Sequence, residues 1–347
     1  MTELTRTDLG KLTRRSFMVM PLALAACKFG TEVFRVSGST MGTAYSVVAL
    51  AASTRSTEEE VKAAIDAALT TVNRKMSNWD ATSEISRFNA QTGTAPVAVS
   101  PALAKVMQEA HSVHMASLAR FDTTIGPLIE LWGFGAPGVT PMPGEAEIAA
   151  ALLRSGHAKT LKVGATSLQK THPQAQVYLA AIGKGYGADV VGEALKTLGI
   201  SDFLVEIGGD LYASGRNPDG LPWQIGIETP SALRRDVLQV IGVSDLGLAS
   251  SGDYRSYIER DDRRYAHILD PRSGRPVTHN TASATVLAEN AMLADAWATA
   301  MHTIGQEEGL ALAEDLGLAV LFIARMQGYD APRFKTTAST AFKALTS

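Results

Sequence analysis

The chain has 347 residues and is 46% hydrophobic, which is enough apolar material for a sizeable core in one large or two smaller domains. Its formal net charge is −3. This composition has no basic excess of the kind that binds phosphate backbones, so it argues against nucleic-acid binding, and we predict no nucleic-acid partner.

The first 27 residues are predicted to be a targeting segment outside the fold. Arg14 and Arg15 match a twin-arginine export signal, and the apolar run after them has roughly ten residues, too few to span a bilayer. The run ends at Cys27 in a sequence that resembles a lipobox. The alternative is an ordinary N-terminal helix with a buried cysteine.

Cys27 is the only cysteine of the chain, so no internal disulfide is expected. We expect a signal segment over residues 1–27 and a mature domain over residues 28–347. Lipidation of Cys27 would make the protein an exported, membrane-anchored lipoprotein facing the periplasm, with the inner membrane favoured and the leaflet left open.

Helical patterns prevail in the first part of the mature chain, after a β-rich run at residues 44–48. Thr57 and Glu60 form a capping-box pattern ahead of apolar residues at helical spacing. Ser100 and Pro101 predict the start of a second helix. A Gly- and Pro-rich loop and a short helix are expected next, at residues 133–144 and 145–154.

Strand patterns prevail in the second part, after a helix that begins at Gly183 and is capped by Gly199. The predicted strands lie at residues 203–207, 223–227, 237–243, 248–250, 284–288 and 318–324. Two more helices are predicted at residues 291–304 and 307–316. Because the strands cluster, the pattern favours an α+β fold with mixed, mainly antiparallel sheets over a doubly wound parallel sheet.

Asp295 and Thr299 stand four residues apart in one predicted helix, so a carboxylate and a hydroxyl share one face, one turn apart. Two hard oxygen ligands so placed suit Mg²⁺, which takes its other ligands from phosphates and water. The structural alternative is that Asp295 caps another segment while Thr299 bonds back to its own helix.

The segment at residues 183–187 is glycine-rich and opens a predicted helix. Backbone N–H groups and the helix dipole favour a phosphate at such a position, and Lys184 adds a positive charge. The spacing matches neither a dinucleotide-binding fingerprint nor a P-loop, and alone a plain glycine-rich turn is the simpler interpretation. Asp210 follows two glycines, where a tight turn and a ligand contact are equally plausible.

His267 is the best general-base candidate among the seven histidines, because it lies at a predicted strand end and histidine titrates near neutral pH. A structural histidine bonded to Asp270 or to backbone is the alternative. The aromatic residues Trp79 and Phe121 have polar neighbours, so a flavin ring could stack there, although aromatic residues are more often part of a core.

Several short motifs, in their order and spacing, resemble the ApbE family of FAD:protein FMN transferases. The resemblance runs from about Phe34 to about Gly305. Its motifs lie at residues 41–43, 76–80, 83–89, 121–128, 132–135, 183–186, 208–210, 251–254, 267–271 and 294–299.

The resemblance implies an ApbE-like, T-fold-like α+β fold and Mg²⁺-dependent transfer of FMN from FAD to a threonine or serine hydroxyl, with release of AMP. FAD is then a substrate, and the acceptor is an exported or membrane-bound redox flavoprotein subunit. One alternative is an FAD pyrophosphatase that yields FMN and AMP. Another is a non-catalytic lipoprotein that holds FAD.

The resemblance also implies roles for particular residues. His267 and Asp253 are the implied catalytic residues. The implied metal ligands are Ala181, through its carbonyl, with Asp295, Ala298 and Thr299. The implied flavin-nucleotide contacts are Met41, Trp79, Phe121, Asp122, Tyr178, Lys184, Gly185, His267 and Ile268.

Tyr178 departs from the family pattern, which has an aspartate at this position. The change removes a charge-assisted hydrogen bond of roughly 1.5–3 kcal/mol, and stacking of the tyrosine ring offsets on the order of 1 kcal/mol of it. On that basis we expect FAD still to bind, and we expect Tyr178→Asp to tighten FAD binding or to raise the transfer rate. The alternative is that Tyr178 packs in the core.

Overall fold

The structure is a computed structural model that describes residues 32–51, 56–134, 141–231, 236–254, 257–260, 263–326 and 333–346. The predicted signal segment, Cys27 and part of the predicted loop at residues 133–144 lie outside these ranges. Among the described helices, none combines the length and the apolar character needed to cross a bilayer.

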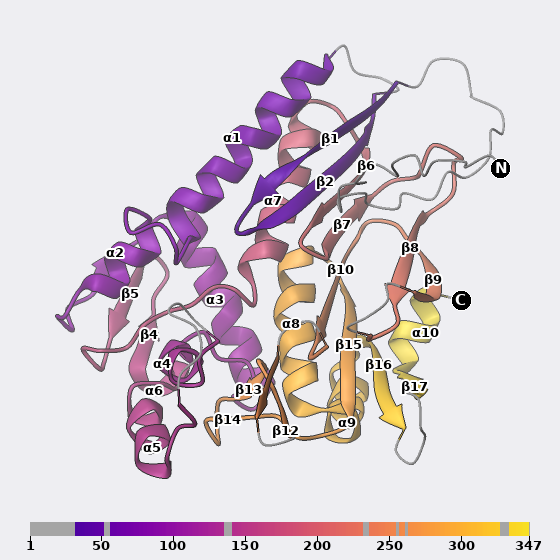
Figure 1. Ribbon diagram of the computed structural model, residues 1–347. Coiled ribbons are helices and arrows are strands. Elements are labelled where there is room, and N and C mark those ends of the chain that lie inside the picture. Colours follow the sequence, from indigo (N-terminus) through magenta and orange to yellow (C-terminus); the bar gives the residue numbers. More distant parts are fainter. Residues whose placement is uncertain are drawn as a thin grey trace, which may run out of the picture.

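An eight-stranded sheet, antiparallel at every pairing, forms the centre of the molecule (Figure 1). Its strands, in spatial order, are β1 (Val33–Thr40), β2 (Thr43–Leu50), β6 (Asp202–Ile207), β7 (Asp210–Ser214), β10 (Leu246–Gly252), β15 (Thr281–Ala288), β16 (Ala319–Met326) and β17 (Arg333–Ala338). The predicted α+β class with mainly antiparallel strands is confirmed.

Three helices cover one face of this sheet, namely α1 (Glu58–Met76), α7 (Gly183–Thr197) and α8 (Ala291–Ile304). The start of α8 lies against β10, since a Cβ atom at Gly247 would stand 2.2 Å from the Ala291 nitrogen. The capping box of Thr57 and Glu60 is present at the start of α1, as predicted. A further helix, α9 (Gln306–Leu316), follows α8 directly.

The opposite face is covered by the hairpin of β8 (Trp223–Glu228) and β9 (Val237–Val243) and by α10 (Thr340–Thr346). Trp223 anchors the hairpin by donating its indole N–H to the Ser214 carbonyl oxygen at 2.9 Å. With both faces covered, seven of the eight residues of β15 are buried, as expected for a central strand.

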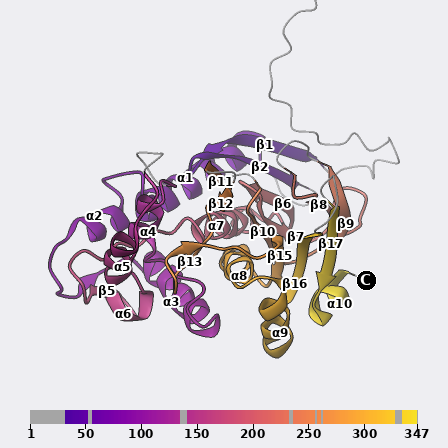
Figure 2. The same ribbon diagram turned by 60° about the horizontal axis from the view of Figure 1, so that its bottom comes forward.

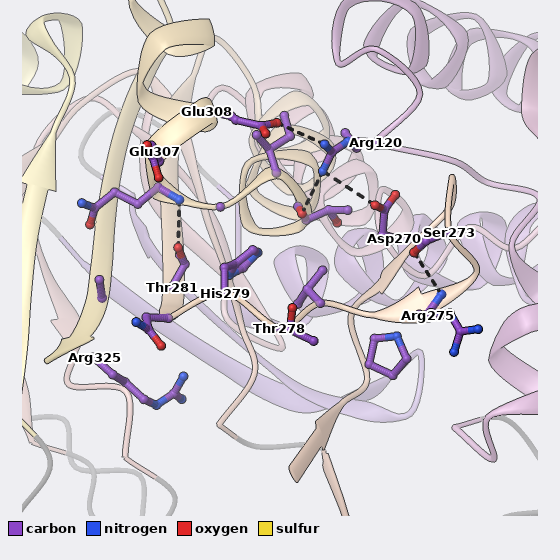
Figure 3. A pocket seen from close by; sticks show the side chains of 18 residues that line it. Arg120, Asp270, Ser273, Arg275, Thr278, His279, Thr281, Glu307, Glu308 and Arg325 are labelled. Carbon is purple, nitrogen blue, oxygen red and sulfur yellow. Dashed lines mark hydrogen bonds and ion pairs between the residues drawn. The ribbon is translucent and has the colours of Figure 1, made fainter. Parts of the chain in front are cut away.

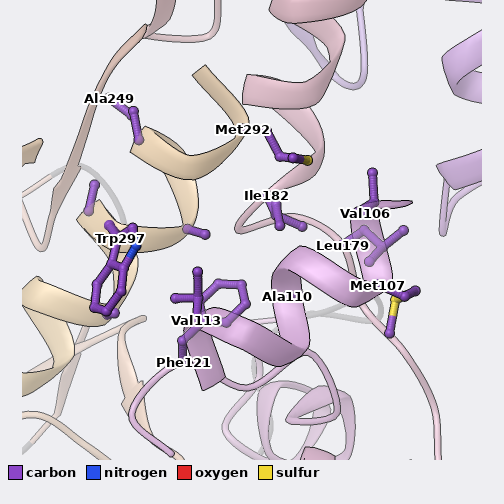
Figure 4. Packing of buried hydrophobic residues seen from close by; sticks show 14 of the residues in the cluster. Val106, Met107, Ala110, Val113, Phe121, Leu179, Ile182, Ala249, Met292 and Trp297 are labelled. Carbon is purple, nitrogen blue, oxygen red and sulfur yellow. The ribbon is translucent and has the colours of Figure 1, made fainter. Parts of the chain in front are cut away.

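A mainly helical region lies beside the α1–α7–α8 layer (Figure 2). It contains α2 (Glu84–Ala90), α3 (Pro101–Ala116), α4 (Gly126–Leu131), α5 (Glu145–Leu153), α6 (His157–Thr160) and a small sheet of β3 (Val97–Ala98), β5 (Ser167–Lys170) and β4 (Leu161–Val163). Apolar residues of α3, including Val106 and Val113, belong to one core with Met292 and Trp297 of α8 (Figure 4). This shared core fixes the helical region against α8.

Two short hairpins complete the described structure, β11 (Tyr257–Arg260) with β12 (Arg263–Ala266) and β13 (Leu269–Asp270) with β14 (Arg275–Pro276). The sequence analysis placed the main helices, the β-rich run that lies in β2, and the strands β6, β8, β9, β10, β15 and β16. It did not predict β1, β7, β17, α10, the short helices α2, α4 and α6, the small β3–β5–β4 sheet or the two short hairpins.

Two buried histidines make stability dependent on pH. Burial lowers the pKa of His157 to about 3 and that of His302 to about 4. Both values lie below the ordinary pKa of about 6.5. Between pH ~6.5 and ~4, the unfolded chain therefore binds more protons than the folded protein does. The free energy of unfolding should therefore decrease as the pH is lowered through that window, by up to about 1.4 kcal/mol per pH unit for each histidine.

The measurement is the melting temperature across pH 7.5 to 4.5. His157→Gln should flatten the dependence, whereas His172→Gln, at a surface turn, should leave it unchanged. A wild-type melting temperature that stays constant over this range would contradict the expected role of the buried histidines.

Candidate functional site

The first turn of α7 lies directly against the first turns of α8. A Cβ atom at Gly185 would stand 2.1 Å from the Ala291 carbonyl oxygen and 2.9 Å from Asp295 Cβ. Glycine permits this approach because it has no side chain. The packing lets Asp295 Oδ2 accept a hydrogen bond from the Gly185 N–H at 3.2 Å. A carboxylate of α8 thus caps the N-terminus of α7.

Lys184 extends between two buried carboxylates. Its Nζ lies 3.0 Å from Asp210 Oδ2 and 3.4 Å from Asp295 Oδ2, and it donates to the Ala180 carbonyl oxygen at 3.2 Å. The side chains of Asp210 and Asp295 are 4% and 6% exposed. We call Lys184, Asp210 and Asp295 the charged cluster, to which α7, β7 and α8 contribute one side chain each.

Two members of the charged cluster, Asp210 and Lys184, have shifted pKa values. Burial, followed by the nearby charge of Asp295, raises the pKa of Asp210 well above its ordinary value, and Lys184 opposes this only in part. Burial acts to lower the pKa of Lys184, but the two carboxylates outweigh it and raise that pKa. Lys184 is therefore a cation at neutral pH between two groups that repel each other.

The backbone at the start of α7 is largely occupied by contacts within the protein. The N–H groups of Ile182 and Gly183 donate to the Leu179 carbonyl oxygen at 3.2 and 2.7 Å, and that of Gly185 donates to Asp295. The expectation that N–H groups at this terminus favour a phosphate is therefore weakened. Lys184 is the group at this terminus best suited to reach one.

The structural alternative for Asp295 holds in part, because the carboxylate does cap another segment. Thr299 lies one turn further along α8 and is half-buried, and Ala298 is 1% exposed. In the described part of the chain, no three His, Cys, Asp or Glu groups are arranged around a metal position. Metal binding at Ala181, Asp295, Ala298 and Thr299 stays a prediction, in which one carboxylate is joined by hydroxyl and carbonyl oxygens.

Met41 and Trp79, two predicted flavin contacts, lie beside α7 or beside the segment before it. A Cβ atom at Gly187 would stand 2.7 Å from Met41 Cε, so Met41 packs against α7. Asn78 bonds to the backbone of residues 177–179 through two hydrogen bonds, of 2.7 and 3.0 Å. The neighbouring Trp79 is 76% exposed, so its ring is available to stack on a flat ligand.

Tyr178 makes well-defined packing contacts. A Cβ atom at Gly126 would lie 2.1 Å from the Tyr178 ring, and the hydroxyl donates to Glu130 Oε1 at 2.6 Å. Burial, followed by the bond to Glu130, raises the pKa of Tyr178, so the hydroxyl stays protonated at neutral pH. These contacts favour the packing alternative, and contact between Tyr178 and a flavin stays a prediction.

Replacing Tyr178 with aspartate should therefore lower stability, because the carboxylate would lie near Glu130 and the ring packing on α4 would be lost. We expect a loss of about 2–4 kcal/mol, against about 1 kcal/mol for Tyr178→Phe, which removes one hydrogen bond. Melting temperature and FAD affinity are measured side by side. An unchanged melting temperature with tighter FAD binding in Tyr178→Asp would restore the interpretation of Tyr178 as a lost carboxylate.

Phe121 and Asp122 act inside the fold in this arrangement. Phe121 is 1% exposed and its ring belongs to the core shown in Figure 4. Asp122 Oδ1 accepts the Thr124 N–H at 2.6 Å, and Oδ2 accepts the His157 N–H at 2.8 Å. Both side chains hold the loop before α4 in shape, and a direct contact with a flavin stays a prediction.

The predicted catalytic residues lie near the second half of α8. The half-buried His267 ring stands edge-on to Phe134, with 6.3 Å between centroids. Asp253 forms a bidentate ion pair with Arg325 of β16, in which Arg325 Nη1 donates at 2.8 Å. Both His267 and Asp253 influence the pKa of His302, which is lowered mainly by burial.

Helix α8 therefore links the two groups of candidates. The charged cluster meets it at Asp295, and His302 lies seven residues further on, about 10 Å along the axis. Ile268 lies between His267 and β13 and is 8% exposed. The Ile268 carbonyl oxygen accepts the Val277 N–H at 3.0 Å, so the backbone of Ile268 is held at the base of the β13–β14 hairpin.

A cavity of about 710 Å³ opens at the C-terminal end of α8 (Figure 3). Its lining includes Arg120, Arg275 and Arg325. Each of these guanidinium groups forms an ion pair, with Glu308, Glu145 and Asp253 respectively. The charged cluster does not line it. The cavity has room for part of a substrate beside the Asp253–Arg325 pair.

Sequence reasoning missed two partners of the site residues, Asp210 for Lys184 and Arg325 for Asp253. Asp210 follows Gly208 and Gly209, which have φ of +58° and +99°, so the predicted tight turn is present. The pairing with Lys184 depends on the packing of β7 below α7, for which the sequence carried no local signal.

The fold and the site together define an α+β protein in which a lysine and buried carboxylates meet at a helix start, a chemistry suited to a phosphorylated ligand and a cation. The model of the ApbE family matches residues 41–322. The chain belongs to the ApbE family.

Individual relatives cover nearly the whole chain. It is 42% identical over 339 residues to an FAD:protein FMN transferase of Haemophilus influenzae, covering 95% of this chain and 96% of that protein. The flavin transferase ApbE structure from Vibrio cholerae matches with a TM-score of 0.82 and 38% identity, covering 91% and 99%. The apo flavinyl transferase ApbE structure from Pseudomonas stutzeri matches with a TM-score of 0.83 and 35% identity, covering 92% and 98%.

Proposed function

We propose that this protein transfers FMN from FAD to a threonine or serine hydroxyl of a target flavoprotein, in a Mg²⁺-dependent reaction that releases AMP. FMN transfer is supported by family membership and by relatives named FAD:protein FMN transferase, which match nearly the whole chain. The observation that carries the chemical proposal is the charged cluster, which places Lys184 and Asp295 side by side at the start of α7.

The residues present fit a magnesium ion. Asp295 and Thr299, with carbonyl oxygens of Ala181 and Ala298, would hold it with the hard oxygen donors that Mg²⁺ prefers. Asp210 Oδ2 is buried and faces Lys184 as an ion pair without hydrogen-bond geometry, so it adds negative charge nearby. When bound, Mg²⁺ neutralises the pyrophosphate and helps AMP to leave.

The reaction is a displacement at the phosphorus atom of the FMN half. The acceptor oxygen forms the new P–O bond, the bond to the AMP phosphate breaks, and the hydroxyl proton passes to His267 as general base. Lys184 would position the pyrophosphate, and the exposed Trp79 ring would stack on a flat part of FAD. Most of the catalytic effect in such transfers is positioning and charge stabilisation.

The two alternatives give different products, so one incubation separates them. The protein is mixed with FAD and Mg²⁺, with and without an exported redox flavoprotein subunit as acceptor. Flavin that stays on the acceptor after denaturation supports transfer. Free FMN formed equally well without the acceptor would indicate a pyrophosphatase, and unchanged bound FAD would indicate storage.

We further propose that the protein is exported by the twin-arginine route and anchored in the periplasm through lipidated Cys27. Cys27→Ser should give an exported protein that leaves the membrane fraction, and replacing both Arg14 and Arg15 with lysine should block export. The measurement is fractionation followed by immunoblotting. Cys27→Ser protein that stays with membranes after a high-salt wash would contradict anchoring by lipidation.

A further inference from the structure

The ammonium group of Lys184 has three partners within the protein. It donates hydrogen bonds to the Ala180 carbonyl oxygen at 3.2 Å and to Asp295 Oδ2 at 3.4 Å. It also forms an ion pair with Asp210 Oδ2 at 3.0 Å, without the geometry of a hydrogen bond. In this arrangement, both carboxylates hold the ammonium by charge, and Asp295 also accepts a hydrogen bond from it.

The three partners differ in how firmly they hold Lys184. Asp210 gives the shortest contact and its side chain is 4% exposed. The two carboxylate oxygens of Asp295 lie further from Lys184 Nζ, at 3.4 and 3.5 Å. One of them also accepts the Gly185 N–H. Asp295 is therefore the weaker carboxylate partner and the one that Lys184 can release at lower cost.

We propose that Lys184 and Mg²⁺ compete for Asp295, and that Asp210 is the positioning residue that keeps Lys184 at the site during the exchange. Binding of the ion at Asp295 displaces the ammonium, which stays paired with Asp210 and gains a free donor for the pyrophosphate of FAD. This inference rests on the proposed use of Mg²⁺, and it explains why a lysine lies where a metal is expected.

The net charge of the cluster predicts opposite changes in Mg²⁺ affinity for two nearly isosteric substitutions. With both carboxylates ionised, the charged cluster carries a net charge of −1, from two carboxylates and one ammonium. Lys184→Met removes the competing cation and leaves −2, whereas Asp210→Asn leaves 0 and lets Lys184 pair with Asp295 alone. In a partly buried cluster these changes are only weakly screened.

The experiment is titration of the purified mature protein with MgCl₂ alone, by calorimetry, without flavin or acceptor. Relative to wild type, Lys184→Met should bind Mg²⁺ about tenfold more tightly, and Asp210→Asn about tenfold more weakly. Lys196→Met is the matched control, because Lys196 lies on the same helix but pairs with Glu193 and Tyr212. Its Mg²⁺ affinity should equal that of wild type.

The melting temperature with and without MgCl₂ provides a second readout and reports whether each variant folds. Mg²⁺ should raise the melting temperature most in Lys184→Met and least in Asp210→Asn. Equal or weaker Mg²⁺ binding in Lys184→Met, or unchanged binding in Asp210→Asn, would overturn the proposal. Neither result depends on whether FAD is transferred, hydrolysed or stored.

Discussion

Replacing Asp295 with alanine is expected to abolish Mg²⁺-dependent release of AMP from FAD while the sheet and core stay folded. Metal neutralisation of a pyrophosphate contributes several kcal/mol to such a displacement, so the rate should fall by about a thousandfold or more. The measurement is AMP formation against MgCl₂ concentration, with the melting temperature recorded for the same preparation.

Asp295→Asn separates the two roles of this side chain. The amide oxygen can still accept the Gly185 N–H and cap α7, but it lacks the charge that a metal site needs. The asparagine variant should therefore keep the wild-type melting temperature and lose activity as the alanine variant does. Wild-type turnover in Asp295→Asn would mean that Asp295 serves only as a cap and that the magnesium assignment is wrong.

Replacing Gly185 with alanine should have the largest effect on stability of the changes considered. The added methyl would lie 2.1 Å from the Ala291 carbonyl oxygen, and this backbone atom cannot move unless α7 and α8 separate. We expect a loss of about 3 kcal/mol or more, which corresponds to a melting temperature lower by roughly 5–10 °C.

Gly187→Ala is the matched control, on the same helix two residues further on. There the nearest atom to an added Cβ is Met41 Cε, the flexible end of a side chain, at 2.7 Å. The cost should be below about 1 kcal/mol, because a methionine can change rotamer. Equal melting temperatures for the two variants would contradict the tight α7–α8 contact on which the site depends.

The sequence predicted the elements that have strong local signals. Helix α8 has the predicted bounds because its apolar face is long and continuous and Asn290 caps it. The capping box of α1 and the Ser100–Pro101 start of α3 could also be predicted, because each signal lies within a few neighbouring residues. By contrast, β17 is a partly exposed edge strand of mixed polarity, and its residues have no alternation that distinguishes a strand from a loop.

For the site as well, the features with a local sequence signal could be predicted and the others could not. The spacing of Asp295 and Thr299 and the position of Lys184 could be seen in the sequence, because each lies within a short motif. The ion pair of Lys184 with Asp210 and the contact of Tyr178 with Glu130 join segments that are distant in the chain. Such pairings result from packing in three dimensions, so spacing alone could not predict them.

The most direct test of FMN transfer is the intact mass of an acceptor subunit after reaction with FAD, MgCl₂ and this protein. The account predicts one FMN added per acceptor, an equal amount of AMP released, and no addition when the acceptor's threonine or serine is replaced by alanine. AMP released without any mass gain on the acceptor, or flavin attached to the alanine-substituted acceptor, would contradict it.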